Sequence, residues 1–428
     1  MAKEKGNFSW VTIFVIGLGF FTTGISWSLF NSYVPVYLQD SISIAFPGFL
    51  LVVALAGFIM GLDNFIAIIM NPIMGSRSDK TSSRFGRRMP YLMVGIPIAV
   101  CFFIGIPIAR LVPGFNGLIS LVVLILGFDI AMAIYRAPIV AMMPDFTPPA
   151  KRSPANGIIN LMGGFGSIFA FVVGSMLYGI EPLLAFGVTA VIMLICLGIL
   201  VLIIREPAAP AEVEKVAFPL RQAISEAFSD RSTLCILLAI FAWFMAFNTL
   251  ETWFTSYGVF TLGWPVNVAS FTMTFFALVF VVFAIPGGLL AQKLGRKRTI
   301  MIGLIGMMVL LGIAPFVTEQ LPLMALLGFA GFFWAFVNVN SIVMLWELSR
   351  KKQGTYTGIY YVSSQSAAAI GPILFGVLVD VLVTFFAFSN STKWILLWPF
   401  SIVFLAVAFI AMFGVSRGEA GEEEALSK

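Results

Sequence analysis

Charge is scarce in this chain, since only 11% of its 428 residues are Asp, Glu, Lys or Arg, and histidine is absent. A soluble domain carries about 25% charged residues, whereas 60% of this chain is hydrophobic. That much apolar surface cannot be hidden in one soluble core, which excludes a cytosolic enzyme, a disordered chain and a nucleic-acid-binding protein. The lack of histidine excludes a histidine proton relay and a histidine-ligated metal.

Cysteine and catalytic motifs are also sparse. The three cysteines, Cys101, Cys196 and Cys235, all lie in apolar runs, so neither a disulfide framework nor a metal cluster is indicated. The chain has no phosphate-binding loop, which argues against an ATP-driven pump, and no nucleophile–base set, which argues against an enzyme. We therefore expect no catalytic residue, no metal and no cofactor.

Long apolar runs dominate the chain instead. A membrane-spanning helix needs about 20 apolar residues, and twelve segments reach that length without the alternation of barrel strands. Because the backbone in lipid must satisfy its own hydrogen bonds, we predict an all-α membrane protein with twelve transmembrane helices. The expected spans are 10–38, 46–74, 90–112, 115–144, 157–180, 183–204, 232–262, 268–291, 299–317, 321–346, 356–388 and 394–415.

The positive charges predict the orientation of these spans. If the N-terminus is cytoplasmic, the cytoplasmic segments hold all 25 lysines and arginines except Arg110, Arg136 and Lys393. Cytoplasmic loops of membrane proteins carry such an excess of positive charge. We therefore expect a multi-pass protein of the cell membrane, a monomer in contact with lipid, with both termini in the cytoplasm and no nucleic-acid partner.

The spans divide into two halves that repeat each other. The loop at 75–88 resembles that at 288–298, Phe30–Tyr33 resembles Phe254–Tyr257, and 145–157 resembles 347–358. Such repeats are typical of rocker transporters, which bind substrate near the midplane between the halves. The expected parts are an N-terminal six-helix half at 1–204, a cytoplasmic linker at 205–231, a C-terminal half at 232–415 and an acidic cytoplasmic tail at 416–428.

Two strings carry a more specific likeness. The pattern Gly75-x-x-x-Asp79-Lys80…Gly86-Arg87-Arg88 resembles the signature loop of the major facilitator superfamily. The longer strings 71–91 and 136–157 resemble the glycoside–pentoside–hexuronide:cation symporters, above all the branch of sucrose–proton symporters. The resemblance implies the major facilitator fold and import of a sugar, a disaccharide or other glycoside, by alternating access.

The chain departs from its relatives at two points. Sodium-coupled melibiose carriers have aspartates where this chain has Ala67 and Asn71, which argues against that sodium site. Plant sucrose carriers have an arginine eleven residues after the aspartate that matches Asp129; here that position is Val140, and the arginine is Arg136, one turn earlier.

Four charged residues lie deep within the predicted spans: Asp63, Asp129, Arg136 and Glu251. A charge at the bilayer centre costs about 2.5–3.5 kcal/mol on insertion scales, so each must face a partner or a wet cavity. We expect the three carboxylates to be candidates for proton coupling, because burial in an apolar cavity raises a carboxyl pKa. The alternative is a static interhelical ion network.

Polar and aromatic residues at helical spacing are the candidates for substrate contact. In the first span Thr23, Trp27 and Asn31 lie on one face, and Phe247, Glu251 and Thr255 repeat the pattern in the seventh. The alternative for each residue is packing or interhelical hydrogen bonding. The full set is Arg136, Trp27, Asn31, Asn64, Asn160, Asn248, Trp334, Asn338, Tyr361 and Gln365.

The cytoplasmic loops predict a gate formed by Asp79, Arg87, Arg88, Asp145 and Arg152. Asp79 can accept from free N–H groups at a helix N-terminus, the two loop arginines can pair with carboxylates of a neighbouring helix, and Asp145 can pair with Arg152. The alternative is that the arginines only anchor the topology and bind anionic lipid. Gly163, Gly164 and Gly166 permit close helix packing, and Asp380 and Lys393 read as ordinary interfacial charges.

These observations predict a secondary transporter that couples sugar import to protons. Proton-coupled efflux of another small organic solute and sodium-coupled sugar symport remain alternatives, and a non-transporting membrane sensor is the weakest, because no segment is large enough for a globular signalling domain.

Overall fold

The computed structural model describes residues 8–148, 151–206, 230–348, 353–386, 389 and 392–416, and the structural statements below concern these residues. Their regular structure is helical, and no strand occurs in this part of the chain. In chain order the helices are α1 Trp10–Ala45, α2 Val52–Lys80, α3 Met89–Ala109, α4 Gly114–Phe146, α5 Arg152–Phe169, a π-helical turn Ala170–Gly174, α6 Ser175–Ile180, α7 Pro182–Ile203, α9 Arg231–Phe260, α10 Val266–Thr272, α11 Thr274–Leu294, α12 Arg296–Ile313, a 3-10 turn Ala314–Phe316, α13 Gln320–Leu348, α14 Gln353–Phe386, a 3-10 turn Lys393–Leu396 and α15 Leu397–Phe413.

Twelve helical stretches of the described chain are long and apolar enough to cross a membrane, which confirms the predicted fold class. The bounds differ most for the first two spans, because α1 continues to Ala45 and α2 begins only at Val52. A turn at Pro47 and Gly48 separates them, and Gly48 has φ +82°, a conformation that residues with a Cβ rarely adopt.

The described residues divide into two compact units. The first unit comprises residues up to Phe46 and those from Ile66 to Glu206, and the second comprises Pro47–Phe65 and the residues from α9 onward. Helix α2 therefore contributes its beginning to the second unit and its remainder to the first. The expected boundary between six-helix halves stays a prediction, since most of 205–231 and nearly all of the tail lie outside the described residues.

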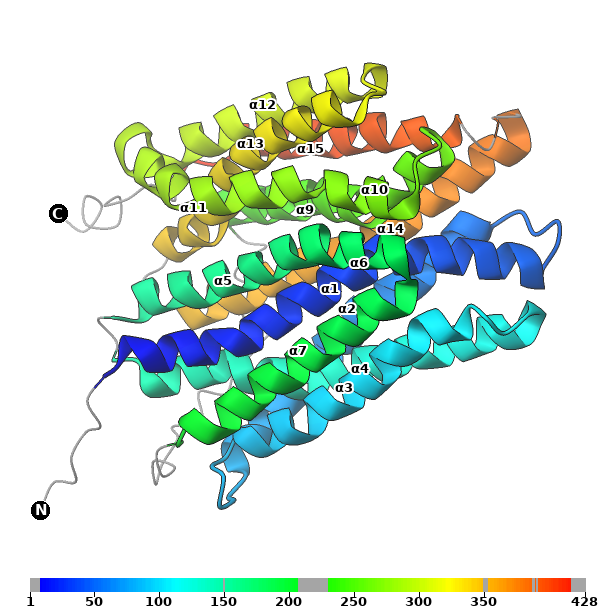
Figure 1. Ribbon diagram of the computed structural model, residues 1–428. Helices are drawn as coiled ribbons and strands as arrows, with labels where there is room; N and C mark the ends of the chain where they lie inside the picture. The colour runs from blue at the N-terminus through cyan, green and yellow to red at the C-terminus, as the bar shows by residue number, and fades with distance from the viewer. Residues whose placement is uncertain are drawn as a thin grey trace, which may run out of the picture. The chain divides into compact units, whose positions relative to one another are not determined.

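In the first unit, α1 packs against α5, α4 and α7, and α3 packs against α4 and α7 (Figure 1). The predicted close approach through glycine is confirmed where α1 meets α5. A Cβ on Gly24 would collide with the backbone of Gly163, and one on Gly166 with the backbone of Phe21 and Ile25. Small residues let two helix backbones approach closely in a membrane, so these glycines position α1, which carries Trp27 and Asn31.

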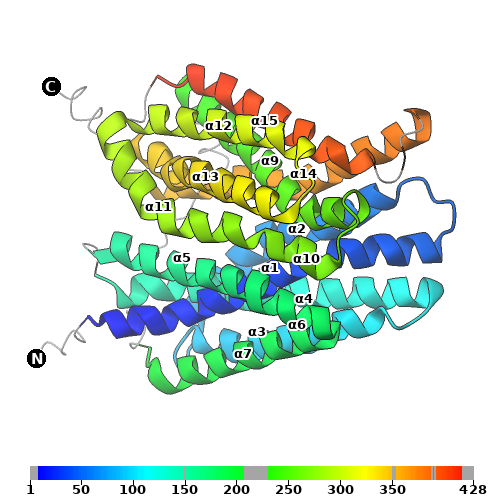
Figure 2. The same ribbon diagram turned by 45° about the horizontal axis from the view of Figure 1, so that its top comes forward.

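In the second unit, α9 packs against α14 and α15, and α13 packs against α11 and α12 (Figure 2). Large aromatic side chains fill this unit: Trp243, Trp253, Trp334, Trp394 and Trp398 are all fully buried. The rings of Trp253 and Trp394 lie 5.6 Å apart, which ties α9 to the 3-10 turn before α15. This packing fixes the backbone of α9 and α13, the helices that carry Glu251 and Asn338.

Candidate functional site

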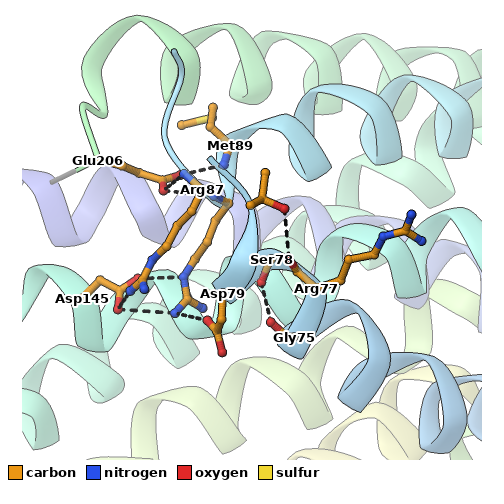
Figure 3. A network of polar contacts seen from close by, with 10 residues as sticks. Gly75, Arg77, Ser78, Asp79, Arg87, Met89, Asp145 and Glu206 are labelled. Atoms are coloured by element: carbon orange, nitrogen blue, oxygen red, sulfur yellow. Dashed lines mark hydrogen bonds and ion pairs between the residues drawn. The ribbon is translucent and has the colours of Figure 1, made fainter. Parts of the chain in front are cut away.

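The loop between α2 and α3 carries the densest polar network among the described residues, and all of it belongs to the first unit. Arg87 donates from Nη2 to Oδ1 of Asp145 on α4 at 2.6 Å, and Nε of Arg88 lies 2.7 Å from Oδ2 of the same carboxylate. Arg88 also reaches Oδ1 of Asp79, at the end of α2, at 3.1 Å. Figure 3 shows the side chain of Arg87 extending from the loop toward Asp145. Two cations thus share one carboxylate and fasten the loop to α4.

Burial shows which carboxylate is the more important counter-charge of Arg88. The side chain of Arg88 is 6% exposed and that of Asp145 is 17% exposed, whereas that of Asp79 is 40% exposed. Burial lowers the pKa of Arg88, and the negative charges of Asp145 and Asp79 oppose that change. The guanidinium stays charged at any ordinary pH. Asp145 is therefore the main counter-charge of a cation held largely away from water.

Glu206, just after α7, binds the backbone of this loop. Its carboxylate accepts hydrogen bonds from the backbone N–H groups of Arg87 at 2.6 Å, Arg88 at 2.9 Å and Met89 at 2.6 Å (Figure 3). Successive backbone N–H groups at a helix start form a natural anion site. The residue that flanks the start of α3 is Arg88, which offers no side-chain acceptor, so the distant carboxylate satisfies these donors.

Gly86 explains why the loop motif needs glycine before its two arginines. Its φ is +103°, in the region that L side chains avoid. A Cβ at this position would also lie 2.5 Å from the Cβ of Glu206. The glycine therefore permits both the turn and the close approach of the carboxylate that accepts from the three N–H groups.

Removal of the Glu206 carboxylate tests this arrangement. We expect Glu206→Ala to lower the free energy of unfolding by about 1–2 kcal/mol, the usual cost of losing an N-terminal helix cap. Glu206→Gln keeps an acceptor oxygen and should cost less. The measurement is thermal unfolding of the purified protein in detergent. Glu181→Ala is the matched control, because Glu181 flanks the start of α7 without a side-chain cap bond; an equal loss in both variants would contradict the assignment.

The observed network joins four of the five expected gate residues. Asp79 accepts a hydrogen bond from Arg88 at 3.1 Å, and its acceptance from a helix N-terminus stays a prediction. The predicted pairing of the two loop arginines with a neighbouring helix is present, through Asp145 on α4. The side chain of Arg152 lies outside the described residues, so its predicted pairing with Asp145 stays untested.

The transmembrane candidates are divided between the two units. Asp129 and Arg136 on α4, Trp27 and Asn31 on α1 and Asn160 on α5 lie in the first unit. The second unit holds Asp63 and Asn64 on α2, Asn248 and Glu251 on α9, Trp334 and Asn338 on α13 and Tyr361 and Gln365 on α14. The pairs of helices α1 and α4, and α9 and α14, pack side by side within their units.

Asp129 is the most deeply buried of the predicted transmembrane carboxylates, at 3% exposed. It follows Phe128, whose ring stacks on Phe30 at 5.3 Å and meets the ring of Trp27 at 5.5 Å. Trp27 also meets Phe30 edge to face at 5.3 Å. Phe128, Phe30 and Trp27 thus form an aromatic cluster between α1 and α4, so Trp27 has packing partners whatever else it contacts. Arg136 is partly buried two turns further along α4.

In the second unit several candidates have local partners. Asn64 donates to Oδ1 of Asp63 at 2.5 Å, and both are partly buried. Asn248 donates to the carbonyl of Phe244 in its own helix at 2.8 Å. The indole of Trp334 stacks on Phe247 at 4.4 Å, so one face of that ring is already covered. Glu251, Asn338 and Gln365 are partly buried.

Two candidates are largely open in the structure. Tyr361 is exposed, and its ring meets that of Tyr360 at 5.5 Å. Asn160 is exposed and donates to the carbonyl of Asn156 at 2.8 Å. One bond to a backbone carbonyl leaves an amide with a second N–H and its oxygen for other partners. The hydrogen-bonding capacity predicted for these positions therefore remains available in the described structure.

Sequence reasoning missed two residues that the structure makes prominent, Glu206 and Asp380. Asp380 was interpreted as an interfacial charge, but it is 3% exposed and accepts from the backbone N–H of Ala54 at 2.7 Å. A signal was available in both cases. Neither α3 nor α2 is preceded by a Ser, Thr, Asp or Asn that could cap it, and such a helix start needs an acceptor from elsewhere.

The comparison with known families decides the identity of the fold. The model of the Major Facilitator Superfamily matches residues 16–272 and 259–428, which is most of the chain. The chain belongs to the major facilitator superfamily. It is therefore a multi-pass membrane transporter and not an enzyme, and the predicted superfamily is confirmed.

The individual relatives of this superfamily member are named for different activities. The sucrose transport protein SUC3 of Arabidopsis thaliana is 31% identical over 173 residues, which cover 35% of this chain and 26% of that protein. The tetracycline resistance protein, class B, of Escherichia coli is 24% identical over 75% of this chain and 78% of its own length. The match to the plant protein thus spans about a quarter of that relative.

A solved structure shares the fold across the whole chain. A bacterial homologue of the human lysosomal transporter Spinster, in an inward-facing and occupied conformation, has a TM-score of 0.73. The likeness covers 97% of this chain and 98% of the other, at 15% identity. It shows that the two chains share a fold.

Proposed function

We propose that this protein is a secondary transporter of the cell membrane that couples uptake of a sugar, a disaccharide or other glycoside, to the movement of protons. The observation that carries the proposal is Asp129, a carboxylate inside a membrane span that is only 3% exposed. A group that binds and releases a proton must be titratable, and the chain has no histidine to serve instead. The partial match to a sucrose transport protein supports sugar as the cargo.

Each charged group on α4 has a proposed task. Asp129 binds a proton from the outer solution and releases it to the cytoplasm, and Glu251 and Asp63 are further candidates for the same role. Arg136 lies roughly 10 Å further along α4 at 1.5 Å per residue. Its planar guanidinium can donate two parallel hydrogen bonds to sugar hydroxyls or to a carboxylate. Trp27, Asn31, Asn160, Asn248, Trp334 and Asn338, with Asn64, Tyr361 and Gln365, are the proposed substrate contacts.

The loop network supports a proposed role in alternating access. Asp145 and Glu206 together hold Arg87 and Arg88, so the α2–α3 loop moves with α4 and the end of α7. We place this network at the cytoplasmic side, with both termini, because positive charge is concentrated in cytoplasmic loops. When the units rock, the α2–α3 loop would then move together with the rest of the first unit. Asp79 is half-exposed, so it is the residue of this network that can exchange its partner.

A direct assay of coupled transport tests the function. Purified protein in proteoliposomes is offered a panel of mono- and disaccharides, and the internal pH is followed with a trapped dye. We expect one class of sugar to acidify the lumen on entry, with the same rate when sodium is replaced by potassium. Acceleration by sodium would favour sodium-coupled symport, and no response to any sugar would overturn the proposal.

Efflux of another small organic solute is a second candidate, favoured by the match to the tetracycline resistance protein over three quarters of the chain. The same vesicles separate the two functions. Under a proton gradient acidic inside, an exchanger concentrates tetracycline in the lumen, whereas a sugar symporter does not. Proton-driven tetracycline accumulation without any sugar response would replace the first proposal by the second.

A further inference from the structure

One side of α9 carries side chains that lipid does not tolerate. Asn248 and Glu251 lie within this membrane span, and both are partly buried. Polar and charged side chains inside a span face a partner or a water-filled cavity rather than lipid. Phe244 and Phe247 are partly buried as well, and the spacing i, i+3, i+4, i+7 places all four residues on one side of the helix. The two phenylalanines therefore lie on the polar side of α9 and not on a lipid-facing side.

Buried aromatic side chains hold Phe247 in place. Its ring stacks on the indole of Trp334 of α13, with the centroids 4.4 Å apart and the planes 7° from parallel. The ring of Phe276 on α11 lies 5.8 Å from it, tilted by 31°. Trp334 is 1% exposed and Phe276 is 4% exposed, whereas Phe247 is only partly buried. Of these three rings, Phe247 is thus the one that presents part of its surface outside the packed interior.

Phe244 packs against the same tryptophan from another direction. Its ring meets the indole of Trp334 at 5.7 Å and 89°, and it meets the ring of Tyr360 on α14 at 6.1 Å. Helices α9, α11, α13 and α14 of the second unit all contribute rings to this cluster. A side chain that is fixed before a ligand arrives loses little conformational freedom on binding, so its contact with the ligand is stronger.

An aromatic surface beside an amide and a carboxylate matches the two kinds of surface on a sugar ring. A pyranose carries hydroxyl groups around its rim and C–H groups on its faces. The face of an aromatic ring is electronegative, so it attracts the weakly positive C–H groups of a sugar. Asn248 donates one N–H to the carbonyl of Phe244 at 2.8 Å, and an amide has a second N–H and an oxygen beyond that bond. Those groups suit the hydroxyl rim.

We propose that Phe247 is the platform on which the ring of a pyranoside stacks, and that Trp334 is a positioning residue that holds this platform. The proposal rests on the proposed function, because it takes the cargo to be a sugar, and it deepens that function by naming a cyclic pyranoside as the substrate class. Trp334 is buried, so it contributes to the substrate site through Phe247. Asn248 lies on the same side of α9 and binds hydroxyl groups of the stacked sugar.

Uptake kinetics in proteoliposomes test the platform with sucrose, maltose and methyl β-D-glucopyranoside as probes. We expect Phe247→Leu, which is apolar but has no aromatic face, to raise KM about tenfold, which corresponds to about 1.4 kcal/mol. The value of kcat should stay unchanged, because stacking binds the ground state and the transition state alike. Phe247→Tyr keeps the ring and should keep the KM of the unmodified protein. An unchanged KM in Phe247→Leu would overturn the proposal.

Phe329→Leu is the matched control for this variant. Phe329 also lies on α13, five residues before Trp334, but it is 63% exposed. We expect its replacement to leave KM unchanged for every probe that is taken up. An equal rise of KM in Phe329→Leu and Phe247→Leu would show a general effect of losing an aromatic ring, and it would overturn the platform.

Two variants of Trp334 separate positioning from packing. We expect Trp334→Leu to raise KM severalfold, because the ring of Phe247 loses the surface on which it stacks. Trp334→Phe supplies a ring again and should restore much of the affinity. The midpoint of thermal unfolding is measured in parallel. A lower midpoint in Trp334→Leu with an unchanged KM would show that the indole only fills the core, and it would overturn the positioning role.

A competition assay on the unmodified protein tests the substrate class without any variant. Sorbitol carries hydroxyl groups as methyl β-D-glucopyranoside does, but it is acyclic and has no fixed C–H face. We expect the glucoside to inhibit uptake of the labelled probe sugar far more strongly than sorbitol, and equal inhibition would overturn the proposal. If the unmodified protein takes up no sugar at all, the proposed function fails and the platform fails with it. If uptake is normal and Phe247→Leu has no effect, the platform alone fails.

Discussion

Asp129→Asn is expected to abolish proton-driven accumulation of sugar while downhill exchange survives. The amide has nearly the shape of the carboxylic acid, so it fits the same buried position on α4. It cannot release a proton, and the coupling step is lost. The measurement compares uptake into proteoliposomes under an imposed pH gradient with exchange of labelled sugar at equal concentrations; accumulation should fall to the level of a control treated with a protonophore.

Asp40→Asn is the matched control for this result. Asp40 is a carboxylate on α1, 40% exposed, whose Oδ2 lies 3.7 Å from Nη2 of the exposed Arg110. We expect its replacement to leave accumulation unchanged. If Asp129→Asn accumulates sugar normally, Glu251→Gln becomes the next test, and normal accumulation in both variants would contradict the assignment of proton coupling to Asp129 and Glu251.

Asp145→Ala is expected to give the largest loss of stability, about 2–4 kcal/mol. The change leaves Arg88 buried with the half-exposed Asp79 and the carboxylate of Glu206 as its remaining counter-charges, and it releases Arg87 as well. A poorly compensated charge in a largely water-free position carries most of that cost. The measurement is the midpoint of thermal or denaturant unfolding in detergent, with transport followed in parallel.

Two further variants separate burial from charge. Asp40→Ala breaks the exposed pair with Arg110, and exposed ion pairs contribute about 0–1 kcal/mol. The double variant Asp145→Leu/Arg88→Met removes both charges and should recover part of the stability lost in Asp145→Ala. A loss in Asp40→Ala as large as that in Asp145→Ala would show that burial is not the cause.

The spans were predictable because hydrophobicity acts locally. A run such as 182–203 needs only its own composition to indicate a membrane helix, and the structure forms α7 over Pro182–Ile203. The end of α1 was less predictable, because Gln39 and Asp40 break the apolar run without ending the helix. Gln39 continues it by donating to the carbonyl of Pro35 at 2.9 Å, a bond that hydropathy does not register.

The residues of the candidate sites could be predicted where the residue type is unusual for its position in the sequence. Asp129 is conspicuous because a carboxylate in a membrane span is costly, and Arg87 and Arg88 are conspicuous because they lie in a recognisable loop motif. Their partner Asp145 is itself one of the predicted gate residues, and the structure joins all three. The assignment of tasks to these residues remains a proposal that the variants above test.

Composition and spacing alone thus determined the membrane class, the twelve helices and the candidate charges, because burial in lipid penalises each polar residue at its own position. Only the tertiary structure decided which distant carboxylate completes which helix. Glu206 and Asp380 are ordinary acids near the ends of predicted spans, yet they cap α3 and α2. The reason is physical: a bare helix start shows that an acceptor is required, but which side chain reaches it depends on how helices far apart in the chain pack together.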